Sequence, residues 1–500
     1  YISGRIWALR QNGSTWSNSL LATDANIVAF GVDPRNGDPL LADIVEGTIK
    51  RLVRSGSSGT NPPALLSQTG AFSNLANLTP NAGILAFEPN VSFWSDYAIK
   101  SRWFSIPNPA ATMTFSRDGN WTFPTGSVWI KHFDLETTRG NPATRRRLET
   151  RFLVKTATGN YGITYKWRLD NSDADLVPEA GQDEVINVIV GGNPTTQTWH
   201  YPSRNECRTC HTPVAGHALS FNTRQLNRPN TYGGQPVNQI QYLSDNGYFA
   251  SPVNGVNNLP AFAQSTDPNQ SLEWRARSYF AVNCVQCHQP GGASLGHWDA
   301  RATTPTDSAN MINGSLVDNR GDSQNKFVVP RDTAHSMALK RIQGNGVPRM
   351  PPLATNELDP NAIQLLTDWI NVDLPQRQTF AEWQVDHFGS TNNPDADSEA
   401  DPDGDGRTNY YEFLAGTDPE SAGSFPAAPD LITSNGQTYL TFIQPANRSA
   451  LIEVSPDLAS WTTWDMPGNQ PGFPSTGQMR SISISLAIPR EFFRIRYGRP

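Results

Sequence analysis

The stretch Ser271–Leu295 (SLEWRARSYFAVNCVQCHQPGGASL) determines how the rest of this 500-residue chain is organised. It contains the pattern Cys-x-x-Cys-His, and a second copy of the pattern lies upstream. The chain has four cysteines, and all four belong to these two copies. The residues of the two motifs are Cys207, Cys210, His211, Cys284, Cys287 and His288. The cysteines are therefore expected to serve one kind of site twice.

Cys-x-x-Cys-His is the attachment pattern of c-type haem, in which two thiols bond to the porphyrin and the adjacent imidazole binds the iron. Cysteines three positions apart lie on one face of a helical turn, so both sulfurs reach the same porphyrin edge. The sequence therefore predicts two covalent haem c groups with His211 and His288 as iron ligands. The alternative is zinc, bound by four thiolates or by two thiolates and two imidazoles. Either zinc site needs remote segments to converge, and the four-thiolate version leaves both histidines unexplained.

Residues 266–376 are predicted to form a small helical domain around the second motif. Ser271–Cys284 shows rough 3.6-residue periodicity, which indicates a helix that ends at the motif. Leu358–Val372 indicates a second helix, with Asp359 as its cap and Pro360 in its first turn.

A methionine lies between these two helices in a loop stiffened by proline. Met350 precedes Pro351 and follows His288 by 62 residues (350 − 288). This separation predicts Met350 as the second axial ligand of the second iron. Met311 and Met337 are weaker candidates because neither lies in a proline-stiffened loop, and the alternative role for Met350 is a core methionine. The arrangement resembles a class I cytochrome c.

The charge and hydropathy of the chain exclude some classes of function. The formal net charge is 39 − 46 = −7. A net negative charge does not indicate a nucleic-acid-binding protein. No apolar run approaches the roughly 18 residues that a membrane-spanning helix needs. Because haem c is attached outside the cytoplasmic membrane, we expect a periplasmic, extracellular or cell-surface bacterial protein. The start at Tyr1 without methionine is interpreted as a processed or fragmentary form.

Residues 1–54 are predicted to form short strands separated by turns, including a turn at residues 33–38. The string YISGRIWALR followed by NIVAFGVDPRNGDPLLADIVEGTIKRL resembles the last blade of the β-propeller of quinoprotein glucose/sorbosone dehydrogenases. One blade cannot bury both of its faces. It should therefore either pack on the part of the chain that follows it or be the remnant of a larger propeller. The resemblance implies a quinoprotein as redox partner and transfers no catalytic residue. Residues 55–63 are predicted to be a linker.

Residues 64–205 are predicted to form an antiparallel β domain, because short apolar or alternating runs lie between Gly, Pro and Asn breaks. The predicted strands are Trp103–Ile106, Met113–Ser116, Trp121–Phe123, Ser127–His132, Phe152–Thr156 and Ile163–Leu169. The blocks FWSDYA (93–98), FPTGSVWIKHF (123–133) and LETR (148–151), together with both haem motifs, resemble a family of exported bacterial dihaem c-type proteins. Residues 206–265 would then hold the first haem.

The second axial ligand of the first haem has several candidates. His132 is chosen because a strand of the β domain can bring it across from the motif. His200 and His217 lie close to the motif in sequence, so the chain would have to wrap sharply, and Met113 is a further candidate. An open, five-coordinate iron is the remaining alternative.

Residues 379–420 are predicted to be a calcium-binding spacer. The stretch DPDGDGRTNYYE (401–412) fits the calcium-loop template, with Gly406 at the turn. The expected ligands are Asp401, Asp403, Asp405, the carbonyl of Arg407, Asn409 through a water, and Glu412. The alternative is a solvated acidic run.

Residues 428–500 alternate apolar and polar residues in several short runs, which predicts a small β-sandwich. The expected fold is thus multidomain and mainly β, with an α-helical cytochrome c domain. We expect electron transfer outside the cytoplasm, with a quinoprotein dehydrogenase or another cytochrome as partner. A dihaem peroxidase or oxidase with an open first haem is one alternative. A homo-oligomeric extracellular haem conduit is another.

Overall fold

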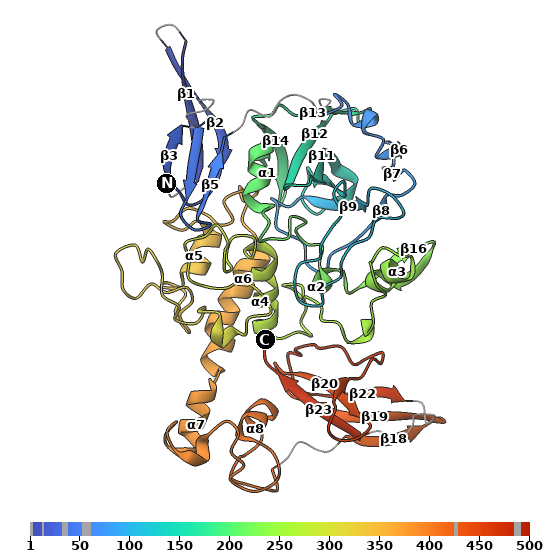
Figure 1. Ribbon diagram of the computed structural model, residues 1–500, viewed down its shortest axis with the longest axis vertical. Helices are drawn as coiled ribbons and strands as arrows, with labels where there is room; N and C mark the ends of the chain where they lie inside the picture. Colours follow the sequence, from blue (N-terminus) through green and yellow to red (C-terminus); the bar gives the residue numbers. More distant parts are fainter. Residues whose placement is uncertain (1–3, 13–14, 33–38, 53–61, 425–428, 485–491) are drawn as a thin grey trace. The chain divides into compact units, whose positions relative to one another are not determined.

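The computed structural model of the protein describes residues 4–12, 15–32, 39–52, 62–424, 429–484 and 492–500. The chain is mainly β, as predicted, and the strands of its sheets pair antiparallel (Figure 1). It divides into two compact units. Unit 1 comprises Tyr1–Ala86, Ala98–Pro107 and Thr125–His217, and unit 2 comprises Phe87–Tyr97, Asn108–Pro124 and Ala218–Pro500. The predicted turn at 33–38 and most of the predicted linker at 55–63 lie outside the described residues.

A six-stranded antiparallel sheet is the centre of unit 1, with the strand order β13-β12-β11-β10-β9-β8. In that order the strands are Ala174–Leu176, Asn160–Trp167, Arg145–Lys155, Val128–Glu136, Ile99–Ser105 and Leu85–Ala86. Successive side chains point to opposite faces of a sheet. The core face buries Trp103, Ile130, Phe152 and Trp167. The other face carries Lys131, Arg151 and Gly162 by register and is here called the motif face.

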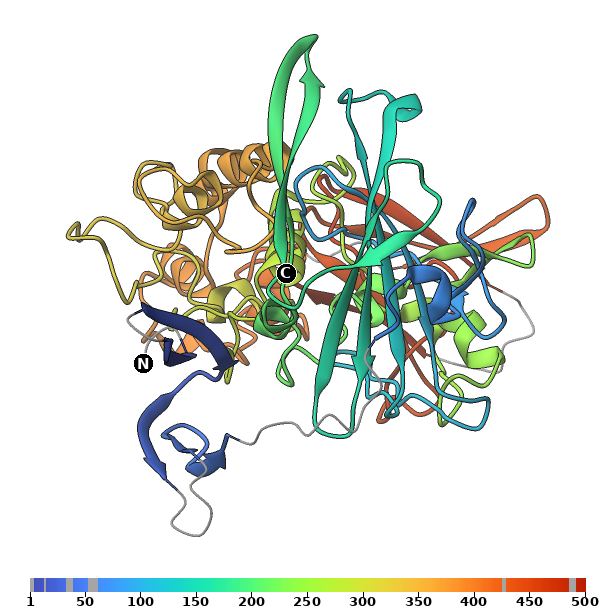
Figure 2. The same ribbon diagram turned by 90° about the horizontal axis from the view of Figure 1, so that it is seen from above.

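Smaller hairpins flank this sheet. They pair β6 (Phe72–Asn74) with β7 (Thr79–Pro80), and β14 (Gln182–Val190) with β15 (Asn193–Tyr201). Figure 2 shows the tip of the green β14–β15 hairpin projecting beyond the sheet. The hairpin ends just before the first Cys-x-x-Cys-His motif.

Two of the predicted strands of this domain are wrong. Residues 113–116 and 121–123 form only isolated bridges, such as Thr114 with Thr122, and they belong to unit 2. Their aromatic rings pack edge-on against unit 2 residues instead of joining the sheet, with Trp121 contacting Phe221 and Phe249 at centroid distances of 5.5 and 5.0 Å. Contacts with distant residues therefore outweighed the local alternation.

The N-terminal segment forms two small sheets. One pairs β1 (Arg5–Asn12) with β2 (Thr15–Thr23), and the other contains β3 (Ile27–Val32), β4 (Pro39–Asp43) and β5 (Thr48–Arg51). Its buried core consists of Ile6, Ile27 and Leu41. Several large apolar side chains of the segment are exposed: Trp7, Leu9, Phe30, Val32 and Ile49.

Three helices surround the second motif in unit 2: α4 (Leu272–Asn283), α5 (Met337–Gln343) and α6 (Pro360–Asp368). Ser271 caps α4 by accepting from the Trp274 N–H at 3.1 Å. Asp359 caps α6, as predicted, by accepting from the Ala362 N–H at 3.0 Å. Helix α6 continues as a π-helical turn, Trp369–Asp373. Figure 1 shows α4 and α6 beside each other, and their shared core includes Ala276, Phe280, Leu339, Leu366 and Trp369.

Unit 2 also contains the calcium-loop region and the predicted β-sandwich. Helices α7 (Phe380–Phe388) and α8 (Asn409–Ala415) flank the loop. One sheet of the sandwich contains β18 (Asp430–Ser434), β19 (Gln437–Gln444) and β22 (Gln478–Ile484). The other contains β21 (Thr462–Thr463), β20 (Ser449–Ser455) and β23 (Phe492–Gly498). Both sheets contribute to one core, which includes Leu440, Ile452, Ile482 and Ile495. The residues of the predicted sandwich thus form two antiparallel sheets with a shared core.

The shorter elements of unit 2 lie between the two haem-motif regions in sequence. They are α2 (Thr223–Leu226), β16 (Pro229–Tyr232), β17 (Gln235–Asn238) and α3 (Gln239–Asp245).

Candidate functional site

The first motif lies at the end of a short helix, α1 (Arg204–Cys210). Ser203 caps its start by accepting from the Glu206 N–H through its hydroxyl oxygen. The Glu206 carboxylate in turn accepts from the Ser203 N–H. His211 is the residue at which the helix ends, with its N–H donating to the Cys207 carbonyl at 3.0 Å. The two cysteines and the histidine thus share one helical turn, as the spacing requires.

Cys207 packs directly against the motif face of the sheet. A Cβ added to Gly162 on β12 would lie 2.3 Å from the Cys207 sulfur and 2.7 Å from its Cβ. Such contacts are far inside van der Waals distance, so only glycine allows α1 to approach the strand this closely. The sheet therefore fixes where the Cys207 sulfur lies.

His211 is held as a neutral imidazole with a defined tautomer. Its Nδ1 lies 2.6 Å from the His217 carbonyl oxygen, which can only accept, so Nδ1 carries the proton and Nε2 the lone pair. Asn160 Nδ2 donates both to the His211 carbonyl and to His217 Nδ1, at 2.6 and 2.7 Å. Burial lowers the pKa of His211 to about 4. Metal-binding histidines commonly donate their second N–H to a carbonyl in this way, so the arrangement fits an iron ligand.

Two basic side chains of the motif face act on His211. Besides burial, the positive charges of Lys131 and Arg151 lower the pKa of His211. Arg151 forms an ion pair with Glu149, whose side chain is fully buried. Burial, followed by the charge of Arg102, lowers the pKa of Lys131 well below its usual value. Sequence reasoning missed this cluster, although the odd-numbered positions of β10 and β11 share one face.

The structure corrects the choice of His132 as the second ligand of the first haem. His132 is fully buried, and its Nδ1 and Nε2 lie 2.9 and 3.2 Å from Thr150 Oγ1 and Asp134 Oδ1. Its ring also contacts Trp167 on the core face, at a centroid distance of 5.6 Å. Cys207 lies on the opposite face, against Gly162. The strand prediction was right, but the alternation of the strand turns His132 away from the motif.

The other candidates for that position are also engaged elsewhere. His200 contacts Asp183 and Glu206 through its two ring nitrogens, at 2.6 and 3.0 Å. The hydrogen bond to Glu206 raises the pKa of His200 to about 9, so His200 is a cation at neutral pH. His217 uses its carbonyl and its Nδ1 to hold His211 and Asn160. Met113 is fully buried in unit 2.

The second motif begins where α4 ends. The N–H groups of Cys287 and His288 both donate to the Cys284 carbonyl, at 3.1 and 2.9 Å. The His288 ring stacks on Trp298, with centroids 4.4 Å apart and an interplanar angle of 28°. Burial lowers the pKa of His288 to about 4, so the imidazole is neutral. Its Nδ1 is buried without a hydrogen-bond partner among the described residues. A neutral, stacked imidazole after two thiols fits haem attachment.

Met350 is not a core methionine. It is 39% exposed, whereas Met311 and Met337 are buried, and the Met311 sulfur accepts from Arg277 at 2.8 Å. The Met350 N–H donates to the Arg341 carbonyl at 3.0 Å. The charge of Arg341 also contributes to lowering the pKa of His288, after burial. Arg341 therefore connects the methionine loop with the surroundings of the motif histidine.

A strap formed by residues 93–97 joins the end of α4 to the segment after the methionine loop. The Trp94 main-chain N–H donates to Asn283 Oδ1 at 2.9 Å, and its indole N–H donates to the Glu357 carbonyl at 3.0 Å. Asp96 accepts from the Glu357 N–H at 2.8 Å. The strap gives the FWSDYA block a role in positioning both sides of the second site, which sequence reasoning did not foresee.

The surroundings of the cysteines do not resemble a zinc site. None of the four cysteines, all of which the structure describes, forms a disulfide. Within the described residues, the groups of three or more metal-donor side chains that converge within 4.8 Å contain no cysteine. Each motif instead has a neutral histidine and two thiols on one turn.

The predicted calcium loop brings its carboxylates together. Oxygens of Asp401, Asp403 and Asp405 lie within 4.8 Å of one another. Glu412 is almost fully buried; burial and the three aspartates raise its pKa to about 7. Asp403 Oδ2 and Glu412 Oε2 are buried without a hydrogen-bond partner in the described structure. Buried carboxylate oxygens that lack a hydrogen-bond partner and lie near other acidic side chains fit a calcium ion.

The two remaining loop positions, Arg407 and Asn409, form hydrogen bonds that hold the loop in shape. The Arg407 N–H donates to Asp405 Oδ1 at 2.7 Å, which closes the turn. Asn409 uses its Nδ2 to donate to the carbonyls of Asp395 and Asp397, both at 2.7 Å. Asn409 therefore also ties the loop to the preceding segment.

Calcium removal should destabilise unit 2. At a free Ca²⁺ concentration 100 times Kd, the ion contributes about 2.7 kcal/mol to the folded state. We expect chelation to lower the unfolding midpoint of the wild type and not that of Glu412→Gln, measured by circular dichroism. Glu399→Gln, an exposed change in the same acidic run, should respond to chelation like the wild type. An unchanged midpoint of the wild type would contradict calcium binding.

Comparison with protein-family models, with curated proteins and with solved structures found no match. Among the described residues, no helix has both the length and the apolar composition needed to cross a membrane.

Proposed function

We propose that the protein is a dihaem c-type cytochrome that transfers electrons outside the cytoplasm of a bacterium. The observation that supports this most strongly is that each Cys-x-x-Cys-His motif presents two cysteines and a neutral histidine at the end of a helix. Haem c, when attached, supplies reversible one-electron storage. The residues of the chain hold the porphyrin, bind the iron and limit access of water.

The second haem is proposed to be saturated by His288 and Met350. The exposed Met350 side chain, the packing of α4 with α6 and the strap at residues 93–97 support this assignment. Iron with His and Met ligands has a higher reduction potential than iron with two histidines, and it leaves no position for substrate. This haem would therefore pass electrons rather than catalyse a reaction.

Replacing Met350 by alanine should remove the long-wavelength ferric absorption band that sulfur ligation produces. We also expect the reduction potential of the second haem to fall, because a sulfur ligand favours the ferrous state. Met479→Ala changes a methionine that is 67% exposed in the sandwich, and this control should keep the band. A band that persists in Met350→Ala would assign the ligand to another residue.

The first haem supports a second candidate function, a dihaem peroxidase or oxidase. His132 and His200 are engaged elsewhere through both ring nitrogens, so a small molecule could occupy that side of the iron. High-spin ferric haem, cyanide binding and peroxide turnover would favour the enzyme. Two low-spin haems without turnover would favour electron transfer.

A quinoprotein sugar dehydrogenase is the proposed electron donor, and another cytochrome is the alternative. Support comes from the resemblance of residues 1–54 to a propeller blade and from the exposed apolar side chains of that segment. Stopped-flow mixing with a reduced quinoprotein dehydrogenase tests the proposal, with rapid haem reduction expected. The proposal would be contradicted if the dehydrogenase reduces the haem no faster than the sugar alone does. Filaments of native protein in electron microscopy would favour the homo-oligomeric conduit.

A further inference from the structure

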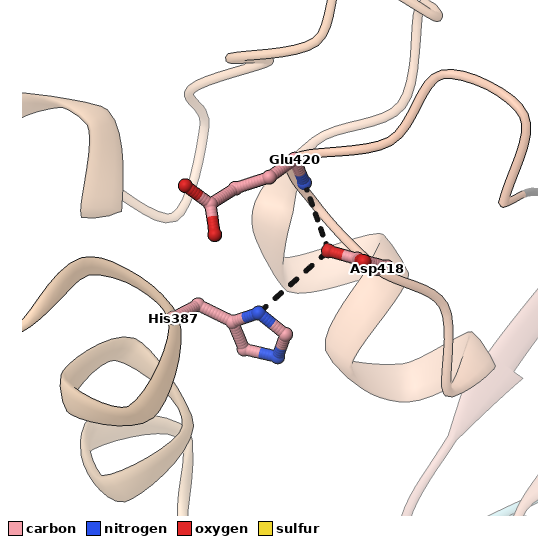
Figure 3. Close-up of side chains that lie close together, drawn as sticks. All are labelled: His387, Asp418 and Glu420. Carbon is pink, nitrogen blue, oxygen red and sulfur yellow. Dashed lines mark hydrogen bonds and ion pairs between the residues drawn. The ribbon is translucent and has the colours of Figure 1, made fainter.

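A second group of metal-donor side chains lies apart from the haem motifs and the calcium loop. His387 is in the last turn of α7, and Asp418 and Glu420 follow α8. One nitrogen or oxygen from each lies within 4.8 Å of the others. Figure 3 shows His387 Nδ1 facing Asp418, with the Glu420 carboxylate turned toward the same space. Two separate elements thus bring three donors together.

The distances in this cluster suit a shared ion better than a hydrogen bond. His387 Nδ1 lies 3.8 Å from Asp418 Oδ1, beyond hydrogen-bond range. Two ligands that are each about 2.0–2.1 Å from a tetrahedral zinc ion are roughly 3.4 Å apart. By contrast, His200 and His335 contact their aspartates through Nδ1 at 2.6 and 2.5 Å, as closed pairs.

Two of the three donors, His387 and Asp418, are held in place before any ion binds, whereas the Glu420 carboxylate is exposed. Asp418 Oδ1 accepts from the Glu420 N–H at 3.1 Å, and the Asp418 N–H donates to Ser424 Oγ at 2.9 Å. The His387 ring contacts Trp383 at a centroid distance of 4.6 Å. Most of the ordering needed to gather the ligands is therefore already present.

The cluster opens onto a cavity of about 620 Å³, which His387 and Asp418 help to line. Arg377, Arg448 and Arg499 line the same cavity. Arg377 Nη2 and Arg499 Nε are buried without hydrogen-bond partners in the described structure. A metal with three protein ligands keeps an open position, and guanidinium groups in the cavity favour an anion or a water there.

We propose that His387, Asp418 and Glu420 bind a divalent transition-metal ion, for which Zn²⁺ is the best fit, with its open position toward this cavity. Imidazole is a ligand for zinc and related metals, whereas calcium prefers oxygen donors alone. The site is therefore distinct from the calcium loop. It would tie the last turn of α7 to the loop after α8.

The test is a calorimetric titration of the mature full-length protein with Zn²⁺ in excess Ca²⁺, followed by zinc X-ray absorption. We expect one Zn²⁺ per chain and a scattering pattern that includes one imidazole. His387→Ala and Asp418→Asn should each weaken binding by at least about tenfold, the loss that even outer-shell changes can cause. His335→Ala removes a histidine from a closed aspartate pair and should leave binding unchanged.

Three results would overturn the proposal. The first is the absence of saturable Zn²⁺ binding under these conditions. The second is wild-type affinity in His387→Ala. The third is loss of binding in Asp405→Asn with retention in His387→Ala, which would assign the zinc to the calcium loop.

Discussion

Gly162→Val is expected to prevent attachment of the first haem and leave the second in place. The Cys207 sulfur would lie 2.3 Å from the first carbon of any side chain at this position, so α1 must move off the sheet. Overpacking of this kind typically costs about 1–3 kcal/mol, and the shift also separates His211 from Asn160. The measurement is the haem-to-protein ratio by pyridine haemochrome, which should fall from two toward one.

Gly159→Ala is the matched control for this prediction. Gly159 adjoins the same strand, and a Cβ added there meets no described atom within 4 Å. The control should keep two haems. Two haems in Gly162→Val would show that Cys207 does not depend on its contact with the sheet.

Arg377→Met should destabilise unit 2 by about 3–5 kcal/mol, the usual cost of removing one partner of a buried ion pair. Arg377 pairs with Glu273 on α4, and their side chains are 4% and 0% exposed. Arg377 also pairs with Asp307. Its loss leaves the Glu273 charge buried, with the Asn447 amide at 2.7 Å as its remaining side-chain partner among the described residues. Chemical unfolding followed by circular dichroism measures the change.

Two further variants separate the ion pair from general damage. Arg320 pairs with Asp318 at the surface, where the side chains are 43% and 60% exposed, so Arg320→Met should cost less than about 1 kcal/mol. The double change Glu273→Gln and Arg377→Met should recover stability relative to Arg377→Met alone, because the fully buried Glu273 then carries no charge. A double variant as unstable as the single one would show that Arg377 acts through packing.

Local signals predicted the helices of the second site well. Ser271 and Asp359 begin α4 and α6 because each offers an oxygen to the first free N–H groups of its helix. The convergence of Asp401, Asp403 and Asp405 was also predictable, since the three lie within five consecutive residues. These features depend on neighbours in sequence.

Features that depend on distant residues were not predictable. The alternation of β10 separates His132 from Lys131, but the face that meets the motif is decided by the contact of Gly162 with Cys207. The strap likewise depends on Trp94 bonding to Asn283, 189 residues away. Glu273 on α4 likewise forms a buried pair with Arg377, which lies 104 residues away.

The mass of the intact mature protein tests the central claim most directly. The account predicts the polypeptide mass plus two haem groups, with one on the peptide containing Cys207 and Cys210 and one on the peptide containing Cys284 and Cys287. A polypeptide without added porphyrin mass, or with zinc in place of iron, would contradict it.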